Sequence, residues 1–240
     1  MIEIDDVTVQ FGGVLGLNAL TANLAEPVTG LVGPNGAGKT TLINVLSGFV
    51  QPTKGRVRVD GRDLKDVPIR KRAAFGLRRT FQNEQIVENL TAGDNVAAVL
   101  DNVPTDGQPR RLLIDKALDF VGLLARRDTP GRDLNAYQRR MLEIARATAG
   151  LPRLIMMDEP GAGLAQHESE HLRDVIKAIH GYCGAQVLLV DHDVDLISAT
   201  CTATLVLDFG SPIAYGPTPN VLADPKVRAA YLGVLEEDAT

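Results

Sequence analysis

The chain has 240 residues, 45% of them hydrophobic, which is enough for one large α/β domain or for a core with a subdomain. A net charge of −5 and an aromatic content of 4% without tryptophan argue against a general nucleic-acid binder. The start is unlike a signal peptide, and no apolar run reaches the roughly 18 residues of a membrane span. The two cysteines, Cys183 and Cys201, suit a reducing cytoplasm. We therefore expect any membrane role to be supplied by other subunits.

The first thirty residues alternate between apolar and polar positions, which predicts antiparallel strands with a turn at Gly12-Gly13. Residues 28–32 predict a short buried strand. Residues 41–46 have the composition of a helix, and a glycine-rich loop separates the two elements.

This loop fits the pattern G-x-x-x-x-G-K-[ST] at every fixed position. Its glycines leave room for the backbone to approach a triphosphate, and the positive end of the following helix would face the phosphates. Lys39 would face the β- and γ-phosphates, and the Thr40 hydroxyl would be a ligand of Mg²⁺. The strand–loop–helix context favours this interpretation over a chance glycine-rich turn. The predicted nucleotide-binding residues here are Gly33, Pro34, Asn35, Gly36, Ala37, Gly38, Lys39, Thr40 and Thr41.

The segment after this helix contains further strands and then a helical region. Residues 52–55 predict a turn, residues 56–59 a strand and Asp60-Gly61 a hairpin turn. Helical spacing dominates residues 84–150, which indicates a helical subdomain inserted into an α/β core. The helices expected there cover residues 96–100, 112–124 and 141–149, with a loop at 104–109.

From residue 153 onward, strands and helices alternate again. Residues 153–157 and 186–190 are apolar runs typical of central parallel strands, and residues 170–179 predict a helix between them. The predicted fold is an α/β P-loop NTPase core with a mostly parallel central sheet, an N-terminal antiparallel β subdomain and an inserted helical subdomain. In this scheme residues 1–240 are one domain, with 1–83 and 151–240 as the core and 84–150 as the helical part.

The first of these apolar runs ends in two carboxylates, Asp158 and Glu159, before Pro160. Acidic side chains at the end of a buried strand are costly unless they have a function. Asp158 is placed to hold Mg²⁺, and Glu159 is placed to act as general base for, or to orient, a water that attacks the γ-phosphate. The alternative is a merely polar strand end.

Two further residues are candidates for the same site. His192 follows the second apolar run, and we interpret it as a contact to the γ-phosphate or to the attacking water, although a lone histidine is more often structural. Gln82 lies at the junction between the core and the helical region. Its neutral amide could ligate Mg²⁺ or water, and a purely structural role is the alternative.

Together these residues resemble the ATP-binding subunit of ABC transporters across essentially the whole chain. The loop matches Walker A, residues 154–159 match Walker B with its catalytic glutamate, Gln82 matches the Q-loop and His192 the switch histidine. Phe11 falls where the family has an adenine-stacking aromatic, although a core phenylalanine would look the same. The resemblance implies ATP and Mg²⁺ as cofactors. It assigns catalysis to Lys39, Gln82, Glu159 and His192, and the metal to Thr40, Gln82 and Asp158.

Finer features resemble the branched-chain and hydrophobic amino-acid uptake subfamily, which includes urea importers. The resemblance implies an importer ATPase at the cytoplasmic face of the cell membrane. Its partners would be transmembrane permease subunits and, indirectly, a periplasmic or extracellular solute-binding protein, with no nucleic acid. The segments that carry it are Phe11-Gly12-Gly13, Arg79-Thr80-Phe81-Gln82, Leu142-Glu143-Ile144-Ala145-Arg146, Gly161-Ala162-Gly163-Leu164 and the terminal residues 224–233.

One departure concerns the family signature Leu-Ser-Gly-Gly-Gln, which precedes a helix. Here the segment is Leu134-Asn135-Ala136-Tyr137-Gln138, so that Ala136 and Tyr137 replace both glycines. In the family two subunits pair head to tail, and each ATP lies between Walker A of one and the signature of the other. A tyrosine ring needs volume where the backbone must approach a phosphate. We therefore expect an intact Walker site of the chain's own and a defective signature offered to the partner's ATP.

This departure favours a heterodimer with a second ABC ATPase subunit over a homodimer. Ala165 also stands where the family usually has Asp or Asn in a loop that contacts the other subunit. Three alternatives remain: a hydrolysis-poor regulatory partner in an asymmetric dimer, a urea or amide importer ATPase, and an ABC ATPase acting on DNA or ribosomes. The last is disfavoured because the chain lacks tandem cassettes and a long coiled-coil insertion.

Overall fold

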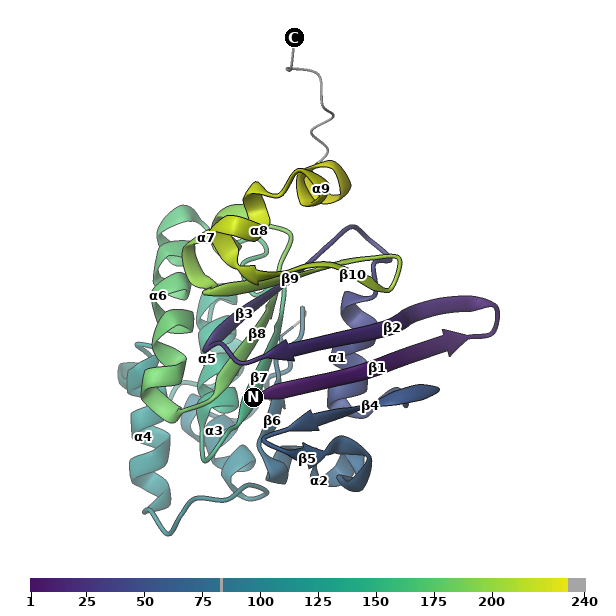
Figure 1. Ribbon diagram of the computed structural model, residues 1–240. Coiled ribbons are helices and arrows are strands. Elements are labelled where there is room, and N and C mark those ends of the chain that lie inside the picture. The colour runs from purple at the N-terminus through teal and green to yellow at the C-terminus, as the bar shows by residue number, and fades with distance from the viewer. Residues whose placement is uncertain (83, 233–240) are drawn as a thin grey trace. The chain divides into compact units, whose positions relative to one another are not determined.

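The computed structural model of the chain describes residues 1–82 and 84–232 and divides into two compact units. The first unit contains Met1–Ile69 and Leu188–Thr240, and the second contains Arg70–Val187. Figure 1 labels the elements in chain order. Within the described ranges, no helix has both the length and the apolar character needed to cross a membrane. Gly233, the last residue of the terminal segment quoted above, lies outside the described residues.

The first unit opens with a four-stranded antiparallel sheet in the order β2-β1-β4-β5. The hairpin between β4 and β5 uses Asp60 and Gly61, whose φ angles of 49° and 75° are those of a tight two-residue turn. The predicted antiparallel β part and its turn at Gly12-Gly13 are confirmed. The strands are β1 (Ile2–Phe11), β2 (Val14–Leu24), β4 (Lys54–Val59) and β5 (Arg62–Asp63).

The turn expected at residues 52–55 is wrong in its second half, because Lys54 and Gly55 already belong to β4. Lys54 pairs with Thr8 of β1, beyond an irregularity in the register. Gly55 has a φ of 77°, and a Cβ there would lie 2.2 Å from the carbonyl oxygen of Asp6. Pairing with β1 therefore continues further than the local turn signal indicated.

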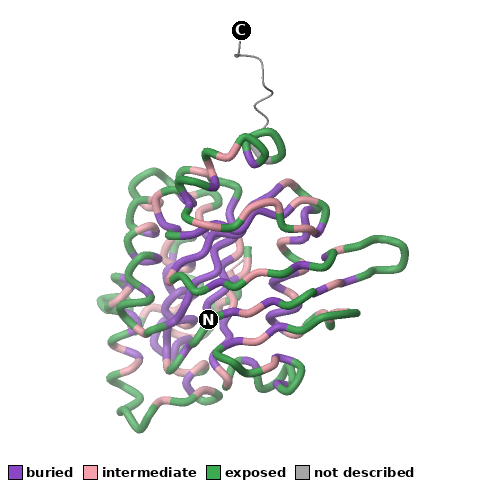
Figure 2. The backbone as a smooth tube through the Cα atoms, in the orientation of Figure 1, coloured by how far each residue is buried: buried purple, intermediate pink, exposed green. Residues whose placement is uncertain are grey.

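The rest of the first unit is built around β3 (Val28–Val32), which is buried at every position (Figure 2). β3 pairs in parallel with β9 (Ala203–Asp208), and β10 (Ser211–Pro217) pairs antiparallel with β9. The helices of this unit are α1 (Lys39–Ser47), α7 (Val194–Thr200), α8 (Thr218–Ala223) and α9 (Pro225–Val227), with a 3₁₀ turn at Leu64–Asp66 and a π turn at Arg228–Leu232.

The second unit combines a short parallel strand pair with a group of helices. β6 (Leu77–Arg79) runs parallel to β7 (Leu154–Asp158), and β8 (Gln186–Val190) crosses from this unit into the first. Helices α3, α4 and α5 pack against one another, which confirms the predicted helical part and the α/β fold class. The helices are α2 (Ile69–Phe75), α3 (Ala92–Leu100), α4 (Arg110–Phe120), α5 (Ala136–Thr148) and α6 (Gln166–Cys183), with 3₁₀ turns at Leu124–Arg126 and Gly131–Asp133.

These helices differ in extent from the prediction, and capping explains the differences. α3 and α5 begin earlier than expected because Thr91 and Asn135 cap them. α4 ends at Phe120 rather than at residue 124 because Gly122, with a φ of 74°, turns the chain. α6 is longer at both ends than residues 170–179 and stops at Gly184, which also has a φ of 74°.

Candidate functional site

The glycine-rich loop joins β3 to α1 within the first unit, as the sequence predicts. Gly33 has a φ of 147°, and a Cβ there would lie 2.1 Å from the carbonyl oxygen of Leu207 in β9. Gly38 has a φ of 105°, and a Cβ there would lie 2.5 Å from the carbonyl oxygen of Gly16 in β2. A side chain fits at neither position, so packing against β2 and β9 determines the course of the loop.

Lys39 folds back over this loop. Its Nζ donates to the carbonyl oxygens of Gly33 at 2.6 Å and of Pro34 at 2.9 Å. Gly38 precedes α1 without a side-chain capping bond, and no acidic residue occupies the first turn of the helix. The start of α1 therefore combines a lysine, the positive end of a helix dipole and first-turn N–H groups without a side-chain cap. This is the environment that a phosphate group requires.

Exposure divides the remaining loop residues into two groups. Asn35, Gly36 and Thr40 are exposed, and so they can meet a ligand from solvent. Ala37 is buried, and its carbonyl oxygen accepts a hydrogen bond from the N–H of Gly210 at 3.0 Å. The loop thus has an anchored side and an open side.

Phe11 lies at the end of β1 and is not a core residue, because 51% of it is exposed. A Cβ on Gly16 would lie 2.8 Å from the Phe11 ring and 3.1 Å from the Thr41 hydroxyl. The ring therefore lies within a short distance of the first turn of α1. The structure does not support the alternative that Phe11 merely fills the core.

His192 follows β8 and belongs to the same unit as the loop. Its side chain is 71% exposed, so it is not a satisfied core histidine. The neighbouring Asp191 is buried, and its Oδ1 lies 3.6 Å from Nδ1 of His192 and accepts a hydrogen bond from the N–H of Asp193. Asp193 in turn caps α7. This arrangement presents an imidazole to solvent on a fixed backbone.

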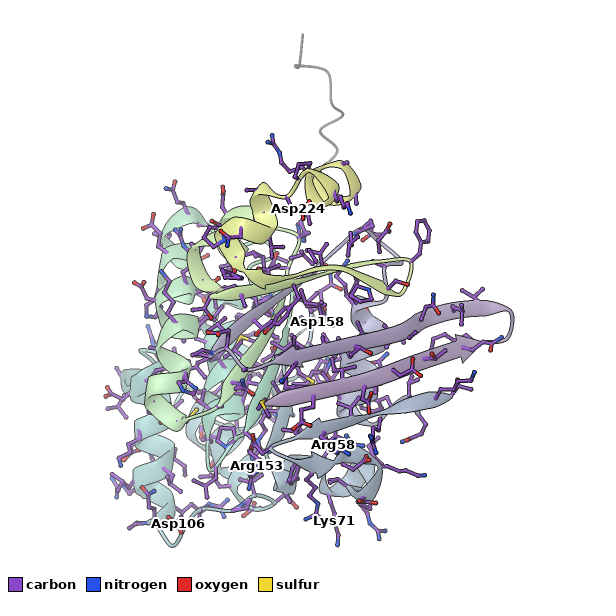
Figure 3. The ribbon with its side chains drawn as sticks, viewed as in Figure 1. Arg58, Lys71, Asp106, Arg153, Asp158 and Asp224 are labelled. Carbon is purple, nitrogen blue, oxygen red and sulfur yellow. The ribbon has the colours of Figure 1, made fainter. Side chains whose placement is uncertain are left out.

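The second unit brings Gln82, Asp158 and Glu159 together. Nε2 of Gln82 donates to Oε2 of Glu159 at 3.0 Å. Glu159 has a φ of 49°, which a residue with a side chain rarely adopts. Asp158, labelled in Figure 3, ends β7 directly before it. The predicted metal ligand Asp158 and the predicted general base Glu159 thus belong to the same unit as Gln82, whereas Thr40, also predicted to bind the metal, belongs to the first unit.

Arg79 is a member of this cluster to which the sequence assigned no role. Its Nη2 lies 3.0 Å from Oδ2 of Asp158, in a pair that is mostly buried, and its guanidinium lies 4.8 Å from the centre of the Phe81 ring. Oδ1 of Asp158 accepts no hydrogen bond from the described residues. It is a hard oxygen ligand of the kind that Mg²⁺ takes from a protein when phosphates supply the others. The residues present therefore fit a Mg²⁺–nucleotide complex.

Helix α5 holds the backbone around Gln82 through two buried charged residues. Nη1 and Nη2 of Arg140 donate to the carbonyl oxygens of Phe81 at 2.8 Å and of Gln82 at 3.0 Å. Oε1 of Glu143 accepts from the N–H of Phe81 at 3.1 Å. Burial raises the pKa of Glu143, and the hydrogen bonds from the N–H groups of Phe81 and Gln85 and the positive charges of Arg140 and Arg146 partly oppose that shift. The position of Gln82 therefore depends on α5.

The signature segment forms the start of α5 rather than preceding it. Asn135 is the N-cap, and its Oδ1 accepts from the N–H of Gln138 at 2.8 Å. Oε1 of Gln138 accepts from the N–H of Asn135 at 3.1 Å, which completes a capping box. Ala136 and Tyr137 are thus the first two helical residues.

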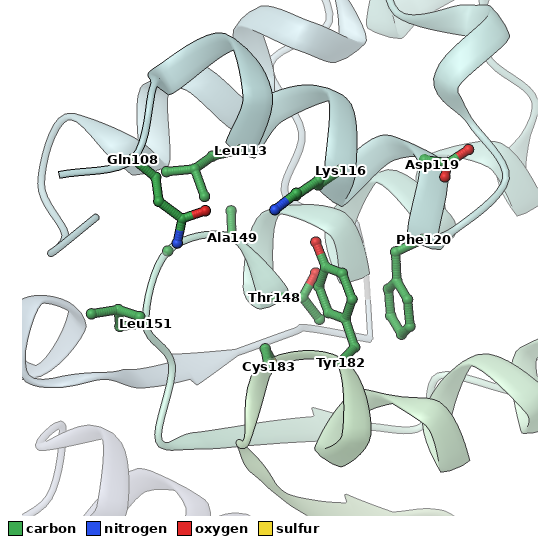
Figure 4. Close-up of a pocket in the computed structure, with 11 residues that line it drawn as sticks. Gln108, Leu113, Lys116, Asp119, Phe120, Thr148, Ala149, Leu151, Tyr182 and Cys183 are labelled. Atoms are coloured by element: carbon green, nitrogen blue, oxygen red, sulfur yellow. The ribbon is translucent and has the colours of Figure 1, made fainter. Parts of the chain in front are cut away.

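A pocket of about 630 Å³ lies elsewhere in the second unit (Figure 4). Lys116 of α4 extends toward the hydroxyl of Tyr182, and the rings of Phe120 and Tyr182 stack with centroids 4.1 Å apart. Neither the loop nor Gln82, Asp158, Glu159 or His192 lines this pocket. Its size therefore does not identify it as the site of the predicted chemistry.

The loop between β3 and α1, together with the carboxylates that end β7, defines a P-loop nucleotide-binding protein of the α/β class. Residues 19–162 match the family described as ABC transporter. The chain is 34% identical to the high-affinity branched-chain amino acid transport ATP-binding protein BraF of Pseudomonas aeruginosa, over 97% of this chain and 98% of that protein. It is 36% identical to the lipopolysaccharide export system ATP-binding protein LptB of Acidithiobacillus ferridurans, over 86% and 85%.

A solved structure supports the same assignment. The ADP conformation of MJ1267, an ATP-binding cassette of an ABC transporter, is 27% identical and superposes with a TM-score of 0.83 over 98% of this chain and 99% of that one. The chain therefore belongs to the ABC transporter ATP-binding family. It is the ATP-binding subunit of an ABC transporter, an ATPase that uses ATP with Mg²⁺.

Proposed function

We propose that this subunit energises the import of branched-chain or other hydrophobic amino acids. The similarity to BraF, which is named for branched-chain amino acid transport, extends over 98% of that protein. The similarity to LptB, which is named for lipopolysaccharide export, extends over 85%. The more complete match supports import of amino acids, with a urea or amide importer as the alternative.

In the proposed mechanism, the loop and its lysine bind the triphosphate. Lys39 and the N–H groups at the start of α1 contact the β- and γ-phosphates, and Phe11 stacks on the adenine. Thr40, Gln82 and Asp158 would hold Mg²⁺, and the bound ion would neutralise phosphate charge. The nucleotide-binding set is Phe11, Gly33, Pro34, Asn35, Gly36, Ala37, Gly38, Lys39, Thr40 and Thr41.

Hydrolysis then depends on Glu159. Its carboxylate accepts a proton from water as the water oxygen attacks the γ-phosphorus, and the bond from the γ-phosphorus to the β–γ bridging oxygen breaks to release ADP. His192 contacts the γ-phosphate or this water. The hydrogen bond of Gln82 to Glu159, at 3.0 Å, is the observation that carries the proposal, because it orients the general base.

We further propose that residues 1–240 act as one ABC ATPase domain on the cytoplasmic face of the cell membrane. In this proposal residues 1–83 and 151–240 form the core and residues 84–150 the helical subdomain. The partners are transmembrane permease subunits, a solute-binding protein indirectly, and a second ABC ATPase subunit. A heterodimer is favoured over a homodimer, because a partner with the family's Ser-Gly-Gly segment would complete this chain's own site.

The test is phosphate release by the complex purified from its host through a tag on this chain. Glu159→Gln should lower turnover at this chain's own site by about 100-fold or more, because an amide cannot accept the proton. Glu170→Gln, which alters an exposed glutamate of α6, is the matched control and should keep the wild-type rate.

Two results would contradict the proposal. Phosphate release that is unchanged in Glu159→Gln would remove the assigned base. Nucleotide binding without Glu159-dependent release would support the alternative of a hydrolysis-poor regulatory partner. Uptake of labelled leucine and of labelled urea by host cells lacking this chain tests the solute, and only leucine uptake should fall.

A further inference from the structure

The structure changes what the replaced glycines of the signature segment imply. Ala136 and Tyr137 both have the negative φ angles of a helix, since neither is among the described residues with positive φ. The conformational freedom of glycine is therefore not needed at these positions. What remains is the added side-chain volume, of which the Tyr137 ring is the larger part.

The Tyr137 side chain contacts the neighbouring helix α6. Its hydroxyl forms a hydrogen bond with Nδ1 of His171 in α6, and the two rings meet edge to face with centroids 6.1 Å apart and planes inclined at 61°. His171 itself lies beside the turn after α4, where a Cβ on Gly122 would lie 3.8 Å from its Cε1. The tyrosine is thus bonded to an exposed histidine of α6 that lies near this turn.

The Tyr137 hydroxyl keeps its proton at neutral pH and so remains available as a hydrogen-bond donor. Burial raises the pKa of Tyr137, and the negative charge of Glu168 raises it further, so the hydroxyl stays protonated at neutral pH. The N–H of Ala165 donates to Glu168 at 3.0 Å, which fixes that carboxylate at the start of α6. The hydroxyl can donate to a neutral imidazole, and its oxygen can accept from a protonated one, so the contact does not depend on the charge of His171.

Without this contact the ring would lie over the start of α5. Side chains of a helix lean toward its N-terminus, and Tyr137 is the second residue of α5. The N–H groups of Ala136 and Tyr137 form no hydrogen bond within residues 1–82 and 84–232. A ring released from α6 would cover these two donors and block the approach of an anion.

We propose that His171 is a positioning residue that holds the Tyr137 ring against α6 and so keeps the start of α5 open to the γ-phosphate of ATP bound by the second subunit. This inference rests on the proposed function. It replaces the expectation of a defective signature with a signature that works as long as His171 retains the ring. The preference for a heterodimer then no longer follows from the replaced glycines.

The test is a double-mutant cycle on phosphate release by the complex purified from its host. His171→Ala and Tyr137→Phe should each lower kcat/KM for ATP about 2- to 12-fold at the site that this chain completes, the factor that corresponds to one net hydrogen bond of ~0.5–1.5 kcal/mol. His171→Gln, which keeps an acceptor, should lose less. In Tyr137→Ala, which has no ring to retain, His171→Ala should have no effect. His167→Ala, an exposed histidine one turn earlier in α6, is the matched control.

All variants are first measured in a chain that also carries Glu159→Gln, which inactivates this chain's own site. The hydrolysis that remains then belongs to the site of the second subunit, which this chain completes. If none remains, the same variants are compared with Glu159 intact. An equal effect of His171→Ala with and without the Tyr137 ring overturns the inference, as does no effect in either background. If phosphate release by the unmodified complex did not depend on Glu159, the proposed function would be overturned instead. The two failures are therefore distinguishable.

Discussion

The hydrogen bond from Gln82 to Glu159 places a neutral amide beside the proposed general base. Gln82→Glu would put a second carboxylate there, and two carboxylates at this distance raise the pKa of one of them. A protonated carboxylate cannot accept the proton of the attacking water. We expect the acidic limb of the pH–rate profile of phosphate release to move to higher pH and kcat at pH 7 to fall about tenfold or more.

A second glutamine of the chain offers a matched control for this substitution. Nε2 of Gln166 donates to Oε1 of Glu170 at 3.4 Å on the exposed side of α6. Gln166→Glu therefore adds the same charge beside a glutamate that has no proposed role in hydrolysis. A profile that moves equally in both variants, or in neither, would show that Gln82 does not act on the base.

At the scale of elements, the contact of α5 with the segment around Gln82 predicts how stability depends on pH. Burial raises the pKa of Glu143 in the folded state above the unfolded value of about 4.3. Above that pH the folded state binds more protons than the unfolded state, so the free energy of unfolding falls as the pH rises toward the folded pKa. In Glu143→Gln this contribution to the pH dependence of the free energy of unfolding is absent.

Urea unfolding at a series of pH values from about 4 to 7 measures this difference. The stability of the wild type should decline relative to Glu143→Gln over the lower part of this range. Glu170→Gln controls for the loss of one carboxylate at an exposed position of α6. A constant difference between the wild type and Glu143→Gln would mean that ionisation of Glu143 is not coupled to folding.

The elements also explain which parts of the site could be predicted. The glycine-rich loop and the carboxylates after β7 are each written in one continuous segment, so local patterns identify them. Arg79 could not be assigned to Asp158 without the pairing of β6 with β7, which sets Arg79 opposite Met156. The partner of Tyr137 lies on another helix, and no local pattern connects α5 with α6. Tertiary contacts therefore decided what the motifs alone left open.

At the scale of the whole molecule, nucleotide binding should increase the free energy of unfolding and raise Tm. A ligand that binds only the folded chain at 100 times its Kd adds about 2.7 kcal/mol, which for a protein of this size raises Tm by about 5–10 °C. Lys39→Met should lose most of the Tm shift produced by ATP with Mg²⁺, because it removes the cation that we propose to face the β- and γ-phosphates. Lys54→Met, at an exposed position of β4, is the matched control. The ATP-induced shift is the informative quantity, since Lys39 also binds the carbonyl oxygens of Gly33 and Pro34 and its loss can change Tm without ligand. A shift of equal size in both lysine variants would contradict the proposed role of Lys39.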